Sequence, residues 1–365
     1  MKVLFDHQCF TNQDYGGISR YFVSLMDEFD KLDNVTTNLA LKYSNNFYLK
    51  GKNNVKPFLP KLNFRGKKFS SHLLNMPDSK FRIRKQDYDI FHPTYYNPYF
   101  LKYLGKKPFI LTVHDMTHEH FPNIVHWFDK TIRQKNILSS KADKIITVSK
   151  TTKDDLIKIL KVPEHKISIV HHGSSINKAM AEETEMMNLP DRYILYVGSR
   201  NYYKNFNNTI KSFSQLIKND ESLFLVCAGG GKFTANEIQL FKEANLTDRI
   251  LHRPADDVSL ATLYSNAKLF IFPSHYEGFG IPVLEAMNCD CPVALSNVSS
   301  LPEVGGDAAV YFDPNDPSDM SKQMARIIYD EKFRIELIEK GEIRRRNFSW
   351  EKTAIETKKV YEQIL

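Results

Sequence analysis

The sequence lacks any long hydrophobic run. None of its 365 residues lie in a stretch of about 18 consecutive apolar residues, the length that a transmembrane helix needs. Its first residues, Met1-Lys-Val-Leu-Phe-Asp6, are too few and too soon acidic for a signal peptide, and they predict a first strand instead. We therefore expect the protein to stay in the cytoplasm.

Cysteine is scarce, and no metal-binding spacing accompanies it. The four cysteines, Cys9, Cys227, Cys289 and Cys291, lie within or beside apolar runs. The pair Cys289-x-Cys291 has no second Cys or His pair at the spacing of a zinc site. We predict reduced, mostly buried thiols, no bound metal and no cofactor.

Two recognition motifs are also missing. The glycines after the first predicted strand, Gly16 and Gly17, do not continue as G-x-G-x-x-G, so a dehydrogenase loses its main support. No nucleic-acid-binding motif is present, and we expect no nucleic acid partner. Asp87-x-Asp89 has the spacing of a metal-binding D-x-D pair, but it precedes a predicted strand, whereas open parallel sheets bind ligands at the carboxyl ends of strands.

Positive charge is concentrated in one segment. The net charge is only +7, yet eleven Lys or Arg residues and one acid, Asp78, lie between Phe47 and Gln86, interleaved with apolar residues. Such a segment suits anionic lipid headgroups or a diphosphate-linked acceptor. A solvated charged surface is the alternative, and both interpretations stay open.

The most informative stretch follows a predicted buried strand at 269–272. Pro273 to Gly280 forms a glycine-containing turn, and a helix begins near Pro282. Free backbone N–H groups and the helix dipole make such a helix start suitable for phosphate or another anion. Glu277 and Glu285 flank this helix start, where each can accept hydrogen bonds from sugar hydroxyls.

This stretch resembles a known family. The sequence Phe272-Pro-Ser-x-x-Glu-Gly-Phe-Gly-x-Pro-x-x-Glu-Ala-Met287 is similar to the E-x7-E signature of retaining GT-B glycosyltransferases, specifically family 4. Residues 291–294 and 299–314 resemble the same family's next strand and donor-side loop. The resemblance runs from Gly16 to the C-terminus and is weakest between residues 31 and 86.

The length and the resemblance together imply the architecture. A chain of this length usually needs two hydrophobic cores. The resemblance implies an α/β protein of the GT-B fold, with two Rossmann-like, doubly wound domains facing each other across a cleft. We expect an acceptor-side domain over 1–185, to which a final helix at 349–365 returns, and a donor-binding domain over 186–348.

The resemblance also implies roles for individual residues. Thr112-Val-His-Asp-Met-Thr117 matches the motif whose histidine lies beside the donor sugar. After a predicted strand at 193–197, Gly198 and Lys204 match a Gly-Arg and Lys pattern that binds the donor phosphates, with the arginine displaced by one position to Arg200. The implied catalytic residues are His114, Glu277, Arg200 and Lys204. The implied donor-binding residues are Gly16, Gly17, Gly198, Gly278, Phe279, Gly280, Ile281 and Glu285.

The implied reaction is metal-independent transfer of a hexose with retention at the anomeric carbon. The donor would be a nucleotide-diphosphate sugar, with GDP-mannose favoured and a UDP-sugar still open. The acceptor would be a glycan or lipid-linked glycan in surface polysaccharide synthesis, with peripheral attachment to an anionic membrane. A nucleotide-sugar sensor of the same fold is the alternative. A sugar phosphorylase would need a longer chain and a lysine-bound pyridoxal phosphate site.

Overall fold

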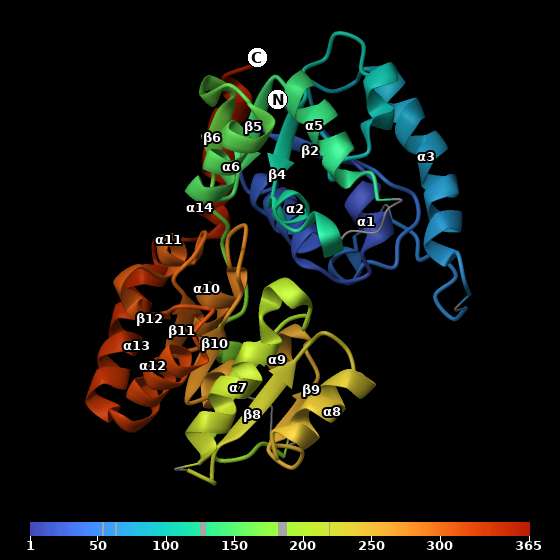
Figure 1. Ribbon diagram of the computed structural model, residues 1–365. Helices are drawn as coiled ribbons and strands as arrows, with labels where there is room; N and C mark the ends of the chain where they lie inside the picture. The colour runs from blue at the N-terminus through green and yellow to red at the C-terminus, as the bar shows by residue number, and fades with distance from the viewer. Residues whose placement is uncertain (53–54, 63, 125–128, 182–187, 219) are drawn as a thin grey trace. The chain divides into compact units, whose positions relative to one another are not determined.

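The computed structural model describes residues 1–52, 55–62, 64–124, 129–181, 188–218 and 220–365, which form two compact units (Figure 1). Unit 1 comprises Met1–His172 and Trp350–Leu365, and unit 2 comprises Gly173–Ser349. The boundary expected at 185/186 lies outside the described residues. Unit 2 begins earlier because the 3-10 turn η5 (Lys178–Ala181) packs against α9 (Asp257–Asn266).

Unit 2 is built on a six-stranded parallel sheet in the order β12-β11-β10-β7-β8-β9. The strands are β7 (Tyr193–Val197), β8 (Phe224–Ala228), β9 (Ile250–Arg253), β10 (Leu269–Phe272), β11 (Val293–Ser296) and β12 (Ala309–Phe312). Besides α9, the helices are α7 (Phe206–Ile217), α8 (Ala235–Glu243), α10 (Ile281–Asn288), α11 (Leu301–Gly305), α12 (Pro317–Tyr329) and α13 (Glu331–Arg345).

Helices cover both faces of this sheet, which explains its nearly continuous apolar strands. Alternate strand residues such as Ile194 and Ile271 share one buried cluster with Phe213 of α7 and Met324 of α12. On the other face, the Tyr264 ring of α9 packs edge-on against Phe270, with the ring centroids 5.3 Å apart.

Unit 1 carries two three-stranded parallel sheets, β2-β1-β3 and β4-β5-β6, joined by a parallel bridge between Phe91 and Phe109. The strands are β1 (Lys2–Asp6), β2 (Thr36–Ala40), β3 (Ile90–His92), β4 (Ile110–Val113), β5 (Lys144–Thr147) and β6 (Ile167–Ile169). The helices are α1 (Gln8–Asn12), α2 (Gly17–Phe29), α3 (Lys67–Lys85), α4 (Thr117–His120), α5 (Thr131–Lys141), α6 (Lys150–Leu160) and α14 (Trp350–Glu362).

The last helix, α14, belongs to unit 1, where it packs against α2 (Figure 1). The Tyr361 hydroxyl lies 2.6 Å from Nδ1 of the buried His92, and the Thr353 hydroxyl donates a hydrogen bond to the His171 carbonyl. These polar contacts link α14 to β3 and to the segment that follows β6.

The expected α/β class with parallel, helix-covered sheets is confirmed in both units. All four cysteines are buried and free, as the apolar surroundings in the sequence predicted. None of the helices in the described part of the chain is both long and apolar enough to cross a bilayer.

Unit 1 also encloses several histidines. Burial lowers the pKa of His92 to about 3 and the pKa values of His7 and His114 to about 4, and it lowers the pKa of His172 well below its usual range. The unfolded chain would protonate these rings near pH 6.5, whereas the folded unit keeps them neutral. Their stabilising contribution is therefore complete above about pH 6.5 and is lost as the pH falls toward the folded values.

We predict that unit 1 loses stability steeply under mild acid. Each such histidine should cost about 2 kcal/mol between pH 7 and 5, which is a large fraction of the roughly 5–15 kcal/mol that stabilises a domain. Urea unfolding followed by tryptophan fluorescence, to which Trp350 of unit 1 contributes, measures this at both pH values. His92→Gln should flatten the dependence, while the exposed His165→Gln should not. Equal stability at both pH values would contradict the prediction.

Candidate active site

The order of the strands in unit 2 reverses beside β7. The chain runs outward from β7 to β8 and β9, then returns to place β10 on the other side of β7. The loops that leave the carboxyl ends of β7 and β10 therefore become neighbours, and open α/β sheets bind ligands where the strand order reverses. These loops are 198–205 and 273–280, which contain most of the site residues expected in unit 2.

Lys204 and Glu277 meet at this point. Lys204 Nζ lies 2.5 Å from Glu277 Oε1, and the two side chains are 15% and 13% exposed. Lys204 ends the 3-10 turn η6 (Tyr202–Lys204), and Glu277 lies in the loop before α10. The pair thus places a cation and an acceptor carboxylate together where the strand order reverses.

Hydrogen bonds to backbone carbonyls hold the two loops together. Asn205, in the left-handed conformation with φ of 58°, donates from its side-chain amide to the carbonyls of Pro273 and Pro314. The His275 amide donates to the Tyr203 carbonyl at 2.8 Å. Since the buried Asn205 follows Lys204 directly, the position of that lysine is tied to the β10 loop.

The Glu277 loop is also fixed from the opposite side by two serines. The Glu277 amide donates to Ser299 Oγ at 3.0 Å, and the Ser300 hydroxyl lies 2.9 Å from the carbonyls of Glu277 and Phe279. Sequence reasoning included these serines in a donor-side loop without assigning them this role. No local signal marks them, because Ser299 and Ser300 lie 22 and 23 residues after Glu277 in the sequence.

The start of α10 requires a glycine. Gly280 has φ of +105°, and a Cβ there would lie 3.1 Å from the Leu301 side chain. Gly278 and the buried Phe279 precede it, and Ile281 is the first residue of α10. The loop therefore leads directly into a helix whose N-terminus carries positive partial charge.

Glu285 lies one turn further along α10, in different surroundings from Glu277. Its side chain accepts a hydrogen bond from the Tyr264 hydroxyl at 3.2 Å, and the residue is only 5% exposed. Burial, with the Glu285 carboxylate beside it, raises the pKa of Tyr264 well above its usual range, so this hydroxyl remains a donor. One Glu285 oxygen is thereby held within the fold.

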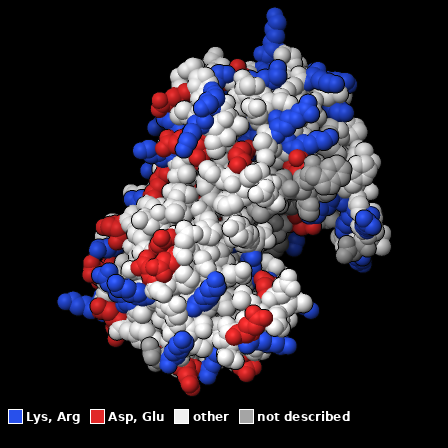
Figure 2. All heavy atoms as spheres, viewed as in Figure 1, with Lys and Arg blue, Asp and Glu red and all other residues white. Residues whose placement is uncertain are grey.

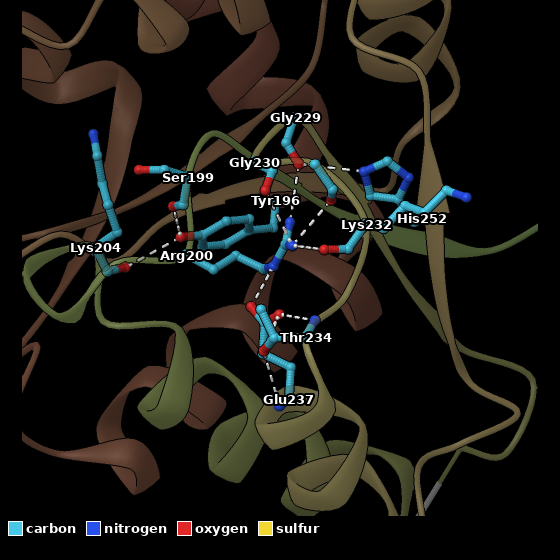
Figure 3. Close-up of polar contacts among 11 residues, drawn as sticks. Tyr196, Ser199, Arg200, Lys204, Gly229, Gly230, Lys232, Thr234, Glu237 and His252 are labelled. Carbon is cyan, nitrogen blue, oxygen red and sulfur yellow. Dashed lines mark hydrogen bonds and ion pairs between the residues drawn. The ribbon is translucent and has the colours of Figure 1, made fainter. Parts of the chain in front are cut away.

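Arg200, expected to bind the donor phosphates, has an extensive set of partners within unit 2. Its Nε donates to Glu237 Oε1 at 2.5 Å, and its terminal nitrogens donate to the carbonyls of Gly229, Gly230, Gly231 and Lys232 (Figure 3). The side chain is 3% exposed. Figure 3 shows Lys204 pointing away from this cluster. The guanidinium thus supports the turn after β8.

Glycines make this arrangement possible. Gly198 has φ of +124°, and Gly230 has φ of +68°. A Cβ on Gly230 would lie 2.8 Å from Arg200 Nη1 and 2.9 Å from the Gly198 carbonyl. Although burial opposes ionisation, hydrogen bonds from Arg200 and Thr234 hold the pKa of Glu237 below its usual value, so the ion pair persists. The displaced arginine in the sequence is therefore explained by a structural role.

The remaining expected residues, Gly16, Gly17 and His114, lie in unit 1. Gly16 precedes α2, and a Cβ there would lie 2.7 Å from Gln13 Oε1. His114 directly follows β4, and its ring stacks on His172 with the centroids 5.7 Å apart. Within the described residues, His114 Nε2 has no hydrogen-bond partner. Burial, with the Lys135 charge also opposing protonation, lowers the His114 pKa to about 4, so the ring is neutral.

Sequence reasoning missed the residue that holds the turn after His114. Lys135 of α5 is fully buried, and its Nζ donates to the Asp115 carbonyl at 2.9 Å and to Glu119 Oε2 at 2.7 Å. No motif marks this pair, because a lysine on one helix and a glutamate on another become partners only after folding.

Asp87 and Asp89 lie at the amino ends of the strands, as the sequence suggested. Asp87 pairs with the Lys2 ammonium, and Asp89 accepts from the Lys2 amide at 2.7 Å. In the described ranges, no three His, Cys, Asp or Glu side chains gather as a metal site requires.

Comparisons with known proteins identify the family. The model described as Glycosyltransferase Family 4 matches residues 15–178, and the model described as Glycosyl transferases group 1 matches residues 181–344. The chain is 27% identical over 294 residues to an Escherichia coli protein named O-antigen chain mannosyltransferase B, covering 76% of this chain and 75% of that protein.

Two solved structures show the same fold. Sucrose-phosphate synthase from Thermosynechococcus elongatus has a TM-score of 0.80 at 20% identity, covering 100% of this chain and 99% of its own. Anabaena HepE, solved with UDP and glucose, has a TM-score of 0.77 at 14% identity, covering 99% of each chain. The two family models together match most of the sequence. The chain therefore has the GT-B fold and belongs to the family 4 glycosyltransferases.

Proposed function

We propose that this glycosyltransferase moves a hexose from a nucleotide-diphosphate sugar to a glycan or lipid-linked glycan during polysaccharide synthesis, with retention at the anomeric carbon. The observation that carries the proposal is the Lys204–Glu277 pair at the strand-order reversal, beside the start of α10. The name of the E. coli relative favours GDP-mannose as the donor, and the UDP bound to Anabaena HepE keeps a UDP-sugar open.

In this proposal, the chain stabilises the departing diphosphate with fixed positive charge. Lys204 and the N-terminus of α10 would face the phosphates, and removal of one preorganised charge typically costs about 10²- to 10³-fold in turnover. Glu277 would accept hydrogen bonds from donor-sugar hydroxyls. Without donor, Glu277 pairs with Lys204. Donor binding would replace the Glu277 carboxylate by a phosphate as the partner of this lysine.

Retention would follow without an enzyme nucleophile. The acceptor hydroxyl would attack from the face that the diphosphate leaves, and its proton would pass to the leaving phosphate. His114 keeps its proposed place beside the donor sugar by family resemblance, and its neutral ring suits hydrogen bonding to a hydroxyl better than ion pairing. Arg200 is omitted from this set, because its guanidinium is bound within the turn after β8.

A donor-hydrolysis assay tests the proposed function. The full chain is incubated with GDP-mannose, UDP-glucose and UDP-N-acetylglucosamine, with and without EDTA. We expect slow release of nucleoside diphosphate from one donor and no effect of EDTA. Binding without turnover of any donor, with or without added glycan, would indicate the sensor. Loss of activity in EDTA that manganese restores would overturn metal independence.

Substitutions of Glu277 and Glu285 should have different effects on nucleoside diphosphate affinity, which calorimetry measures. Glu285→Gln should weaken binding of free nucleoside diphosphate, because its proposed partner is the ribose. Glu277→Gln should bind nucleoside diphosphate at least as well as the parent, because it removes the carboxylate that competes with phosphate for Lys204, while turnover falls at least about tenfold. Equal losses of nucleotide affinity in both variants would contradict these roles.

Arg200 and Lys204 should also differ. Arg200→Met leaves Glu237 without its buried partner, so we predict a loss of about 3–5 kcal/mol in the unfolding free energy. Arg200→Lys should not restore the lost stability, because an ammonium group cannot donate to several carbonyls at once as the planar guanidinium does. Lys204→Met should mainly reduce turnover. A normally stable Arg200→Met protein that no longer binds nucleoside diphosphate would restore the phosphate-binding role.

The C-terminal half of the basic segment forms α3, and the exposed face of this helix supports the proposed membrane attachment. Phe69 and Phe81 are each 66% exposed, and Leu73 is 56% exposed. Figure 2 shows Lys and Arg side chains at both ends of the region that α3 occupies in Figure 1. An exposed helix that combines cations with apolar side chains is typical of segments that lie on anionic bilayers.

We predict that the protein sediments with anionic liposomes at low salt and is released at high salt, since each Lys or Arg at the surface contributes about 1 kcal/mol and salt screens it. Lys80→Glu/Lys85→Glu should abolish sedimentation. Lys322→Glu/Lys332→Glu, which makes the same charge change on exposed lysines of unit 2, should not. Failure of the parent to bind even at low salt would leave α3 as a solvated charged surface.

A further inference from the structure

Unit 1 contains two adjoining cavities that the proposed reaction does not yet use. Their volumes are about 450 and 300 Å³, within the range of about 300–1,000 Å³ that suits small ligands. Both are lined by Asp14, Asn45 and Lys67. Their lining residues come from the loop after α1, from the described residues within 44–51 and 55–60, and from the start of α3. We call these cavities together the Asp14 pocket.

The walls of the Asp14 pocket are held by hydrogen bonds. The Asn45 side chain exchanges two hydrogen bonds with the backbone of Phe58, at 2.8 and 3.0 Å. The Asn46 side-chain amide donates to the Gln13 carbonyl at 2.7 Å, and the Phe47 backbone amide donates to the Asp14 carbonyl at 2.8 Å. Because these framework groups already bond to one another, the pocket is formed before any ligand enters.

The groups presented to the pocket are both polar and apolar. The exposed Asp14 side chain can accept hydrogen bonds, and Lys50 and Lys67 can donate them. Phe58 and Phe64 supply apolar surface in the smaller cavity, and Phe64 is 41% exposed. A sugar ring presents hydroxyls at its edge and C–H groups on its faces, so it matches this mixture.

Two exposed aromatic rings belong to chain neighbours of the pocket-lining residues. Tyr15 and Phe47, which adjoin Asp14 and Asn46 in the chain, are each 42% exposed, and their ring centroids are 5.8 Å apart. The Tyr15 hydroxyl accepts a hydrogen bond from Arg20 Nη2, and Arg20 Nε donates to the Tyr48 hydroxyl. Exposed aromatic rings can stack against the C–H face of a sugar.

The pocket is lined by charges of both signs. Its one carboxylate, Asp14, stands with the ammonium groups of Lys50, Lys67 and Lys68. Two of these ammonium groups already have partners in the fold: Lys68 Nζ donates to the Asn12 carbonyl, and the Lys50 ammonium lies 4.6 Å from the centre of the Phe47 ring. An acceptor carboxylate and ammonium donors in one pocket suit a polyhydroxylated molecule, which offers donors and acceptors together. The pocket also adjoins the glycine pair Gly16–Gly17, because Asp14 is only two residues before it.

We propose that the Asp14 pocket binds an uncharged saccharide unit of the acceptor glycan, at a subsite separate from the sugar that receives the hexose. This inference rests on the proposed transfer to a glycan. It assigns Asp14, Lys50 and Lys67 to recognition of sugar hydroxyls, and Tyr15 and Phe47 to contact with a sugar face.

Ligand-observed NMR on the full chain tests the proposal. The probes are methyl α-mannoside, an α-linked mannobiose, methyl α-glucoside and methyl β-galactoside, with pyrophosphate as the anionic comparison. We expect at least one saccharide to bind the parent, and Asp14→Asn to weaken it about tenfold or more, because a hydrogen bond to a charged acceptor is lost. Val55→Trp, which fills the larger cavity, should abolish the signal.

Asp33→Asn is the matched control, since Asp33 is an exposed aspartate beyond the opposite end of α2 and should leave saccharide binding unchanged. The pocket assignment is overturned if no saccharide binds at tens of millimolar, if binding survives both pocket variants, or if only pyrophosphate binds. Calorimetry with GDP and UDP on the same samples reports the proposed donor site in unit 2. If the parent binds neither nucleotide, the proposed function is overturned. If the parent binds a nucleotide but no saccharide, only the subsite is overturned.

Discussion

The reversal of strand order beside β7 is the constraint on which the candidate site depends. Parallel strands need crossover helices, so the chain that leaves β9 must return across the sheet before β10 can pair with β7. The loops after β7 and β10 are thereby separated from their outer neighbours and brought to face each other. Lys204 and Glu277 occupy those loops, and Asn205 ties the loops together through the carbonyls of Pro273 and Pro314.

Arg200 and Lys204 have different partners in this region. Arg200 donates hydrogen bonds to Glu237 and to the carbonyls of a turn whose glycines have positive φ angles. Without Arg200, these buried polar groups would be unpaired. Lys204 points elsewhere and pairs with the Glu277 carboxylate. A rigid turn on one side and an exchangeable ion pair on the other suit a site that must release a charged product.

Unit 1 relies on polar groups buried in its interior, some neutral and some paired as ions. His92 connects Thr112 of β4 to Tyr361 of α14, while Lys135 and Glu119 support the turn that carries His114. Such buried networks stabilise one arrangement only while every member keeps its protonation state. The same unit presents the Asp14 pocket, whose framework amides are already satisfied, and the exposed face of α3.

The sequence by itself determined the α/β class, the buried strands and the helix start after Gly280, because apolar runs and glycine turns act through local geometry and burial. It also singled out Lys204 and Glu277 as site residues through the family signature. Only the tertiary structure revealed that the two side chains pair and that Arg200 bonds to Gly229–Lys232 and Glu237, because these partners are distant in sequence. The Lys135–Glu119 pair, the bond from Tyr264 to Glu285 and the Asp14 pocket were hidden for the same reason. Each arises from contacts between elements, which residue spacing along one segment does not encode.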